Sequence, residues 1–449
     1  MKHESSTLAR ALSLRHVVLF GLAFMAPLTV FVTYGVAIES TRGMIPTAYA
    51  IALTVMLFTA YSYGAMSKAF PIAGSSYTFT QKAISSHLGF LVGWTILLDY
   101  VLSPMISSLI VGLYANAYFP SIPMFVWIIL FITVITTVNI LGIKIAASFN
   151  MCVVVFQILF FAAFTFLSIK GLLAGQGAGH VFSLLPFYDP HVELASLFGV
   201  IPLLCFSFLG FDAVSTLSEE TRNPVSTLPR AILLITLIGG ILFIVVTYFA
   251  QLIFPQFREF ASPETAATQI IVFLGGNALN AVFTAVMVTT SFASAVASGA
   301  SSSRILYAMG REKVLPQKVF GYLSPRFQTP VYNLLLIGAI SLSAIYMDID
   351  KAVSFINFGA LFAFIFVNLS VIAHYFIKKR NRSAGGWVRY FFIPLVGALC
   401  TGWFWTQSNA HALLFGGSWL FCGIVYLMYV TKMFRKKPPE LHFDEGESA

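Results

Sequence analysis

The chain has 449 residues, of which 58% are hydrophobic and 10% are charged, and it carries a formal net charge of +9. Soluble domains have about 45–50% apolar and about 25% charged residues, so this chain cannot cover the surface of a soluble protein of its length. Its Lys and Arg are scattered between apolar runs rather than gathered on one face, which argues against nucleic-acid binding and indicates a polytopic membrane protein.

Twelve apolar runs are long enough to cross about 30 Å of hydrocarbon as helices. A membrane β-barrel is excluded because its strands are short and alternate in polarity. The sequence therefore predicts an all-α fold with twelve transmembrane helices, referred to below as spans 1 to 12. In chain order they cover about 17–37, 44–66, 88–114, 124–142, 149–173, 195–218, 230–254, 277–303, 330–347, 352–377, 388–406 and 411–431.

The positive-inside rule places both termini in the cytoplasm, with the protein in the cytoplasmic (inner) membrane. In that orientation the outside segments hold four of the 26 basic residues, namely Arg42, Lys170, Arg258 and Lys351. The longest outside segment, about 174–194, carries a few acids and histidines. These are interpreted as the polarity of an exposed loop, and neither a metal nor a cofactor is expected. The residues are His180, Asp189, His191 and Glu193.

Spans 1 and 6 each contain a helix-breaking feature. Pro27 in the middle of span 1 removes a backbone hydrogen bond, which the membrane tolerates only where protein or a water-filled cavity satisfies the freed groups. In span 6, Gly210 is followed by the acid Asp212. Interruptions five spans apart are what an inverted repeat of five plus five helices predicts, with the substrate at the broken ends.

This repeat divides the chain into four parts. Residues 1–16 form a cytoplasmic N-terminus, 17–377 a ten-helix LeuT-like transport core, 378–431 two C-terminal helices and 432–449 a cytoplasmic tail.

The broken ends of spans 1 and 6 suit different parts of a substrate. The N-terminus of a half-helix suits a carboxylate, and the carbonyl end suits an ammonium group or a cation.

Asp99 lies near the middle of span 3, where a charge costs about 2.5–3.5 kcal/mol, so such residues are functional by default. It is a candidate for binding a substrate ammonium, for carrying a coupling proton, or for both. The alternative is a protonated or hydrogen-bonded packing residue. For Asp212 two interpretations stay open: it faces the binding site, or it caps the inner half-helix.

Three motifs in order resemble the amino acid–polyamine–organocation superfamily. They are the aromatic-Pro-x-Ala-Gly-x-x-Tyr segment Phe70 to Tyr77, the span 6 signature Gly210 to Ala213 with Glu219 to Pro224 and Leu228 to Ile232, and the span 8 end Ser303 to Arg311. Within the superfamily the chain looks closest to the bacterial putrescine importers. The resemblance implies a secondary active transporter for a small amine.

The expected substrate-binding residues lie at the two breaks and in span 3: Ala26, Pro27, Leu28, Thr29, Asp99, Tyr100, Phe206, Ser207, Gly210 and Asp212. In relatives an aromatic residue at the position of Phe206 closes over the substrate, which implies a gating role here. The expected coupling and gating residues are Asp99, Tyr77, Glu219, Glu220 and Arg304, the last three as an inner-gate charge network near Lys68 or Tyr77.

Two positions depart from the relatives. The putrescine importers carry an Asp, a natural partner for a second amine, where this chain has Val32, so putrescine and an amino acid both stay open as substrate. Many proton-coupled relatives carry a Lys in span 5 facing the break of span 1, where this chain has Gln157. Hydroxyls in the small-residue run Ala293 to Ser303 offer a sodium site, although close helix packing is the favoured interpretation.

Other functional classes fit less well. Two intramembrane acids resemble an aspartyl protease dyad, but the chain has Leu209-Gly210-Phe211-Asp212 instead of Gly-x-Gly-Asp. A channel or a transporter-derived receptor is the other rival. The sequence predicts an importer of a small amine in the lipid bilayer, coupled to protons, with a sodium-coupled or exchange-type permease as the alternative.

Overall fold

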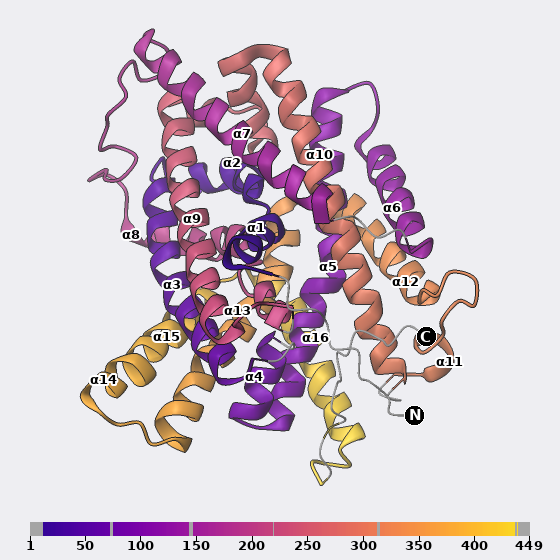
Figure 1. Ribbon diagram of the computed structural model, residues 1–449. Helices are drawn as coiled ribbons and strands as arrows, with labels where there is room; N and C mark the ends of the chain where they lie inside the picture. The colour runs from indigo at the N-terminus through magenta and orange to yellow at the C-terminus, as the bar shows by residue number, and fades with distance from the viewer. Residues whose placement is uncertain are drawn as a thin grey trace.

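The computed structural model describes residues 12–71, 75–142, 147–218, 220–311, 315–435 and 438, and within them every regular element is helical (Figure 1). The predicted all-α class is confirmed. The α-helices are α1 Leu14–Met25, α2 Val30–Ser40, α3 Ile45–Ala69, α4 Ser75–Ala83, α5 Ser86–Tyr118, α6 Met124–Ile140, α7 Ala147–Leu173, α8 Leu194–Cys205, α9 Pro224–Ile253, α10 Ala266–Arg311, α11 Gln317–Phe320, α12 Val331–Ser341, α13 Ile349–Val371, α14 Ala384–Trp387, α15 Ile393–Thr406 and α16 Ala410–Val430.

Short 3-10 and π-helical segments connect or extend the α-helices. The 3-10 helices are η1 Pro27–Thr29, η2 Phe206–Phe208, η3 Ala213–Ser218, η4 Phe257–Glu259, η5 Pro263–Thr265 and η6 Leu342–Tyr346. Two π-helical segments, η7 Ile372–Lys378 and η8 Val388–Phe392, extend α13 and precede α15. Several predicted spans are therefore composed of more than one element.

Ten helical paths in the described part of the chain are long and apolar enough to cross a membrane. The apolar helices Met124–Ile140 and Val331–Tyr346 are shorter, at roughly 25 Å each from their helical rise. Each of these twelve segments coincides with one predicted span. Helix α10 extends beyond predicted span 8 at both ends and is interrupted by a non-helical conformation at Gly276 (φ 64°), next to the predicted start at residue 277.

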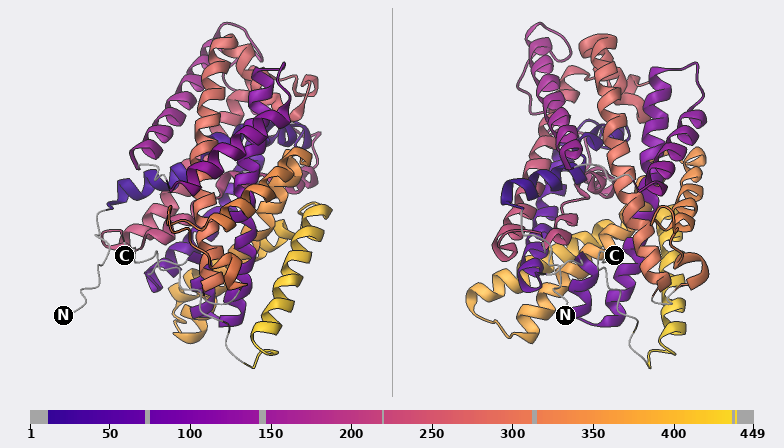
Figure 2. Two further views of the ribbon diagram at one scale, coloured as in Figure 1. Left: turned by 90° about the vertical axis from the view of Figure 1, so that its right-hand side faces the viewer. Right: turned by 45° about the vertical axis from the view of Figure 1, so that its right-hand side comes forward.

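Helix α5, which carries Asp99, is the central helix of the bundle. It packs against α10, α13, α4, α6, α12 and α16, and 78% of its most apolar stretch of 18 residues is buried inside the protein. Helix α16 is the opposite case, because only 17% of its most apolar stretch of 18 residues is buried and the helix lies at the edge of the bundle (Figure 2). Most of α5 is thus packed against other helices.

Segments that connect different spans contact one another in three places. The Lys378 ammonium donates to the carbonyl of Lys82 (3.3 Å), and Leu12 pairs with Thr221. The Ile349 amide donates to Glu264 (3.2 Å). Each contact joins segments that are far apart in the chain.

Candidate functional site

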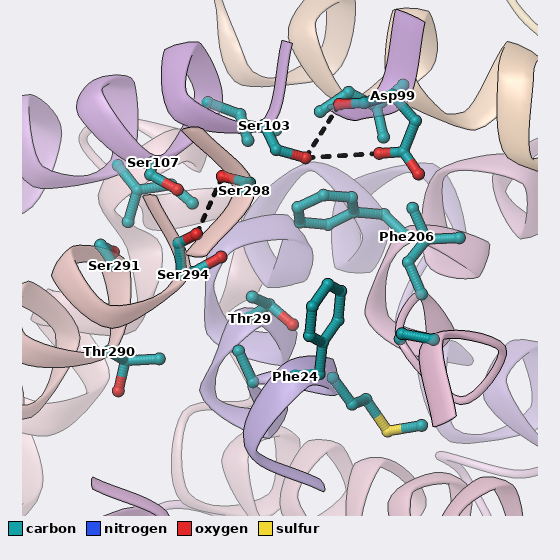
Figure 3. A pocket seen from close by; sticks show the side chains of 18 of the residues that line it. Phe24, Thr29, Asp99, Ser103, Ser107, Phe206, Thr290, Ser291, Ser294 and Ser298 are labelled. Carbon is teal, nitrogen blue, oxygen red and sulfur yellow. Dashed lines mark hydrogen bonds between the residues drawn. The ribbon is translucent and has the colours of Figure 1, made fainter. Parts of the chain in front are cut away.

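A cavity lies where the breaks of spans 1 and 6 meet α5 and α10 (Figure 3). Its walls combine two carboxylates, several hydroxyls and aromatic rings. The lining residues are Phe24, Met25, Ala26, Thr29, Asp99, Tyr100, Ser103, Ile106, Ser107, Ile110, Phe206, Leu209, Gly210, Asp212, Ala213, Met287, Thr290, Ser291, Ser294, Ser298 and Ile356. Seven of the ten predicted substrate-binding residues are among them: Ala26, Thr29, Asp99, Tyr100, Phe206, Gly210 and Asp212.

The break in span 1 begins where α1 ends. Ala26 adopts a left-handed conformation (φ 48°), and Pro27 then starts the short 3-10 helix η1 before α2 continues the span. Proline fits this first position because its missing N–H would have no helical partner there. The helix is therefore interrupted at mid-span, as the sequence predicts, and Ala26 and Thr29 on the two sides of the break line the cavity.

The break in span 6 brings its backbone directly against span 1. Gly210 has a φ of 116°, which side-chain-bearing residues rarely adopt, and a Cβ atom there would lie 2.7 Å from the Met25 nitrogen. Both the backbone conformation and the lack of space for a side chain therefore require glycine at this position. The second half of span 6 also differs from the expected α-helical half, because it is the 3-10 helix η3.

Asp99 faces the cavity from the middle of α5. The Ser103 hydroxyl donates to the backbone carbonyl of Asp99 at 2.9 Å and lies 3.4 Å from its Oδ1 atom. Within the described residues no Lys, Arg or His pairs with this carboxylate. A buried acid without a basic partner is available to a cationic ligand or to a proton.

Asp212 lines the same cavity from the turn between η2 and η3. Its Oδ1 atom accepts a hydrogen bond from the Gly210 amide at 3.2 Å, and its backbone carbonyl accepts one from the Ser215 hydroxyl at 2.7 Å. The carboxylate therefore both faces the site and satisfies a backbone donor of the break. The Gly210 amide precedes η3, so this bond is not the predicted cap of the inner half-helix, and both interpretations of Asp212 stay predictions.

Hydroxyls on α5 and α10 also line the cavity, and of these the sequence had drawn attention only to Ser294 and Ser298, in the run Ala293 to Ser303. Ser103 and Ser107 follow Asp99 at intervals of four, so all three lie on one face of α5. The same spacing on α10 gives Thr290, Ser294 and Ser298. Extending the helical face of Asp99 by two turns would have found the first pair.

The small-residue run of α10 takes part in helix packing and also lines the cavity. Ser302 donates to the Tyr100 carbonyl (2.6 Å), which fastens α10 closely to α5. Ser294 and Ser298 nevertheless reach the cavity, and the Ser298 hydroxyl donates to the Ser294 carbonyl at 2.8 Å. Helix packing and a polar cavity wall thus come from successive turns of one helix.

Two aromatic rings occupy the space between the carboxylates and the hydroxyls. Phe24 at the end of α1 and Phe206 at the start of η2 both project into the cavity (Figure 3). The position of Phe206 at the break fits the gating role implied by the resemblance. Phe24 was not singled out by the sequence, because one Phe among 45 carries no signal of its own.

Three predicted binding residues are buried beside the cavity but do not line it: Pro27, Leu28 and Ser207. The Leu28 amide donates to Oε1 of Gln157 on α7 at 3.2 Å. Gln157 therefore sits opposite the break of span 1, where the resemblance predicts it. Ser207 instead exchanges a 2.9 Å hydrogen bond with the Tyr49 hydroxyl on α3.

Val32 is packed in the apolar core of the bundle, with 1% of its surface exposed, and it does not line the cavity. Val32 therefore contributes to the packing of the bundle and not to the cavity wall.

Three of the predicted inner-gate residues, Tyr77, Glu220 and Arg304, do not line the cavity. Tyr77 on α4 packs with Leu306 and Met309, close in sequence to Arg304 at the end of α10. Glu220 is partly buried, and its carbonyl accepts a hydrogen bond from the Leu12 amide (3.0 Å). Glu219 lies outside the described residues, and the charge network stays a prediction.

Comparison with known proteins identifies the family. The model of the amino acid permease family matches residues 16–433. The chain belongs to the amino acid permeases. This family is part of the amino acid–polyamine–organocation superfamily, so the resemblance found in the sequence motifs is confirmed. An amino acid permease of this size is a membrane transporter and not an enzyme, which sets aside the protease interpretation.

Several curated relatives support the assignment over most of their length. The low-affinity putrescine importer PlaP of Escherichia coli (strain K12) is 42% identical over 434 residues, covering 96% of each chain. The branched-chain amino acid permease BcaP of Bacillus subtilis is 25% identical and covers 82% of this chain and 81% of its own. The methylthioribose transporter of Bacillus subtilis is 25% identical and covers 96% and 95%.

Proposed function

We propose that this permease imports a small amine, with putrescine as the first candidate, and that its ammonium group binds between Asp99 and Asp212. The observation that carries the proposal is that both carboxylates line one cavity and lack a basic partner in the described part of the chain. The 42% identity to a putrescine importer supports the substrate class. Val32, where the putrescine importers carry an Asp, is not among the residues that line the cavity.

The charge of the cavity supports proton coupling. Two carboxylates in one membrane cavity are costly unless positive charge neutralises them. One ammonium group bound between the carboxylates neutralises one of them, and the other is left to take a proton. In our proposal Asp99 carries the coupling proton, the broken spans hold the substrate, and alternating access exposes the cavity to each side in turn.

We further propose that all twelve apolar helices cross the membrane, with both termini in the cytoplasm and residues 17–377 forming a five-plus-five inverted repeat. The interruptions at Ala26 and Gly210, five spans apart, support this arrangement. The presence of twelve apolar helical segments in the described part of the chain supports the crossing number. Reporter fusions after each predicted span would test it, and a fusion with the opposite polarity would contradict it.

The function is tested by uptake of radiolabelled putrescine into proteoliposomes under an imposed inward proton gradient. We expect uptake that a protonophore abolishes, and we expect Asp99→Asn to lose its dependence on the gradient. Asp212→Asn should weaken binding and raise KM. Asp189→Asn, in the exposed connection between α7 and α8, is the matched control and should transport normally.

Competition by amino acids and other polyamines in the same vesicles ranks the substrates. If Asp99→Asn keeps both uptake and its pH dependence, the proposed role of Asp99 is wrong. Sodium coupling is the second candidate, since Thr29, Ser294 and Ser298 line the cavity beside the span 1 break. Uptake that follows a sodium gradient at equal pH would show that the coupling ion is sodium and not a proton. Uptake that needs substrate inside the vesicles would indicate exchange.

A further inference from the structure

The connection between α7 and α8, residues 174–193, presents large apolar side chains outside the helical spans. Phe182 is 90% exposed, Leu184 79%, Leu185 62% and Tyr188 68%. These four residues are called the loop patch below. Between residues 171 and 188 the chain has no Asp, Glu, Lys or Arg. An exposed apolar patch of this kind in a loop marks an interaction surface.

The backbone beneath the loop patch is fixed to two spans. The Tyr248 hydroxyl on α9 donates to the Val181 carbonyl (2.9 Å) and accepts from the Ser183 amide (3.0 Å). The Thr47 hydroxyl on α3 donates to the Phe187 carbonyl (2.7 Å). Because the backbone on both sides of the patch is held in this way, its side chains face away from the bundle.

These attachments set the depth of the loop. Tyr248 is five residues before the last residue of α9, so the Val181 carbonyl is held about 8 Å inside the end of that helix. Figure 1 shows the connection running down the flank of the bundle from the end of α7 to the beginning of α8. The loop therefore lies beside the ends of the spans and not above them.

We propose that the loop patch inserts into the bilayer interface at this end of the protein, with lipid as its partner. Apolar and aromatic side chains without charge, held about 5–10 Å below the headgroup level, are the chemistry that binds there. The chain returns to a polar sequence at Asp189, whose carboxylate accepts a 2.9 Å hydrogen bond from the His191 amide. The membrane contact thus ends just before α8, the first part of broken span 6.

The test places a nitroxide label at Phe182→Cys, and separately at Leu185→Cys, in the full chain after the exposed Cys152 and Cys422 are replaced by Ala. Labelled protein is reconstituted into vesicles of phosphatidylethanolamine and phosphatidylglycerol. Collision with oxygen, which partitions into lipid, is compared with collision with a water-soluble nickel chelate. We expect oxygen to dominate at both positions, as at a Leu159→Cys control on the exposed face of α7.

His191→Cys is the matched water-facing control, because the His191 side chain is also 90% exposed and lies in the same connection. We expect the nickel chelate to dominate there. If the labels at 182 and 185 behave like the label at 191, the proposal is overturned. Spectra broadened by spin–spin coupling that sharpen on dilution with unlabelled protein would reveal a second copy as the partner, which also overturns it.

Discussion

Trp94 on α5 and Trp419 on α16 hold each other through reciprocal hydrogen bonds. Each indole N–H donates to the backbone carbonyl of the other residue at 2.9 Å, and the rings stack with centroids 4.9 Å apart. Gly423, one turn after Trp419, leaves room for the Trp94 ring. This pair fastens the largely lipid-exposed α16 to the helix that carries Asp99.

Replacing either indole removes one donor while keeping an aromatic ring. We expect Trp94→Phe and Trp419→Phe each to lower the free energy of unfolding by about 1 kcal/mol, since a hydrogen bond contributes about that much. Thermal unfolding of the purified variants measures the loss. Trp127→Phe is the control, because the Trp127 indole nitrogen has no protein partner in the described part of the chain. Equal losses in all three variants would contradict the prediction.

Gly210 should not tolerate alanine. The methyl group would meet the backbone of Met25 at 2.7 Å, and the φ of 116° would add strain. We expect Gly210→Ala to lose most uptake even where the protein is produced and inserted. Gly199→Ala is the matched control, since it lies in α8 of the same span with no atom within 4 Å of its Cβ position. Normal uptake by Gly210→Ala would show that the contact between the breaks is dispensable.

Gln157 should position the break of span 1. Its Oε1 atom accepts the Leu28 amide, so Gln157→Met, of similar volume, leaves a buried N–H without its acceptor. An unsatisfied buried group costs about 1–3 kcal/mol. We expect a lowered unfolding temperature together with a raised KM, because the unwound segment lines the cavity through Ala26 and Thr29. Leu159→Met, on the exposed face of α7, should change neither quantity, and a stability loss with unchanged KM would make the role of Gln157 structural only.

Asp348 caps α13, which contributes Ile356 to the cavity. Its carboxylate accepts the Lys351 amide at 2.8 Å and pairs with the Lys351 ammonium at 2.6 Å. Partial burial opposes ionisation, but these bonds to Lys351 outweigh it and hold the pKa of Asp348 below its usual range. The ionised form is therefore favoured by folding, so its stabilisation is complete above the usual Asp pKa and is lost as the pH falls through the lowered pKa.

From this cap we expect Asp348→Ala to lower the free energy of unfolding by about 1 kcal/mol at neutral pH. Asp348→Asn keeps a capping oxygen, so it should lose less and its stability should depend less on pH than that of the wild type below about pH 4. Unfolding in detergent across acidic pH measures both effects. The ion pair itself is partly exposed and contributes little. An alanine variant as stable as the asparagine variant would refute the capping role.

The sequence by itself determined the class of protein, the all-helical fold, the positions of the twelve apolar segments, the breaks at Pro27 and Gly210, and the intramembrane acids Asp99 and Asp212. These features follow from local chemistry. The length of an apolar run identifies a span, a proline or glycine within the run indicates a break in the helix, and a charged residue within the run stands out from its apolar neighbours. The partners across the bundle were decided only by the tertiary structure. Examples are the contact of Gln157 with Leu28, the contact of Gly210 with Met25, and the placement of the α10 hydroxyls inside the cavity and of Val32 outside it. These contacts depend on how helices that are far apart in the chain rotate and approach one another. The sequence does not reveal them, because in an almost uniformly apolar chain hydrophobicity does not distinguish a helix face that meets lipid from one that meets another helix.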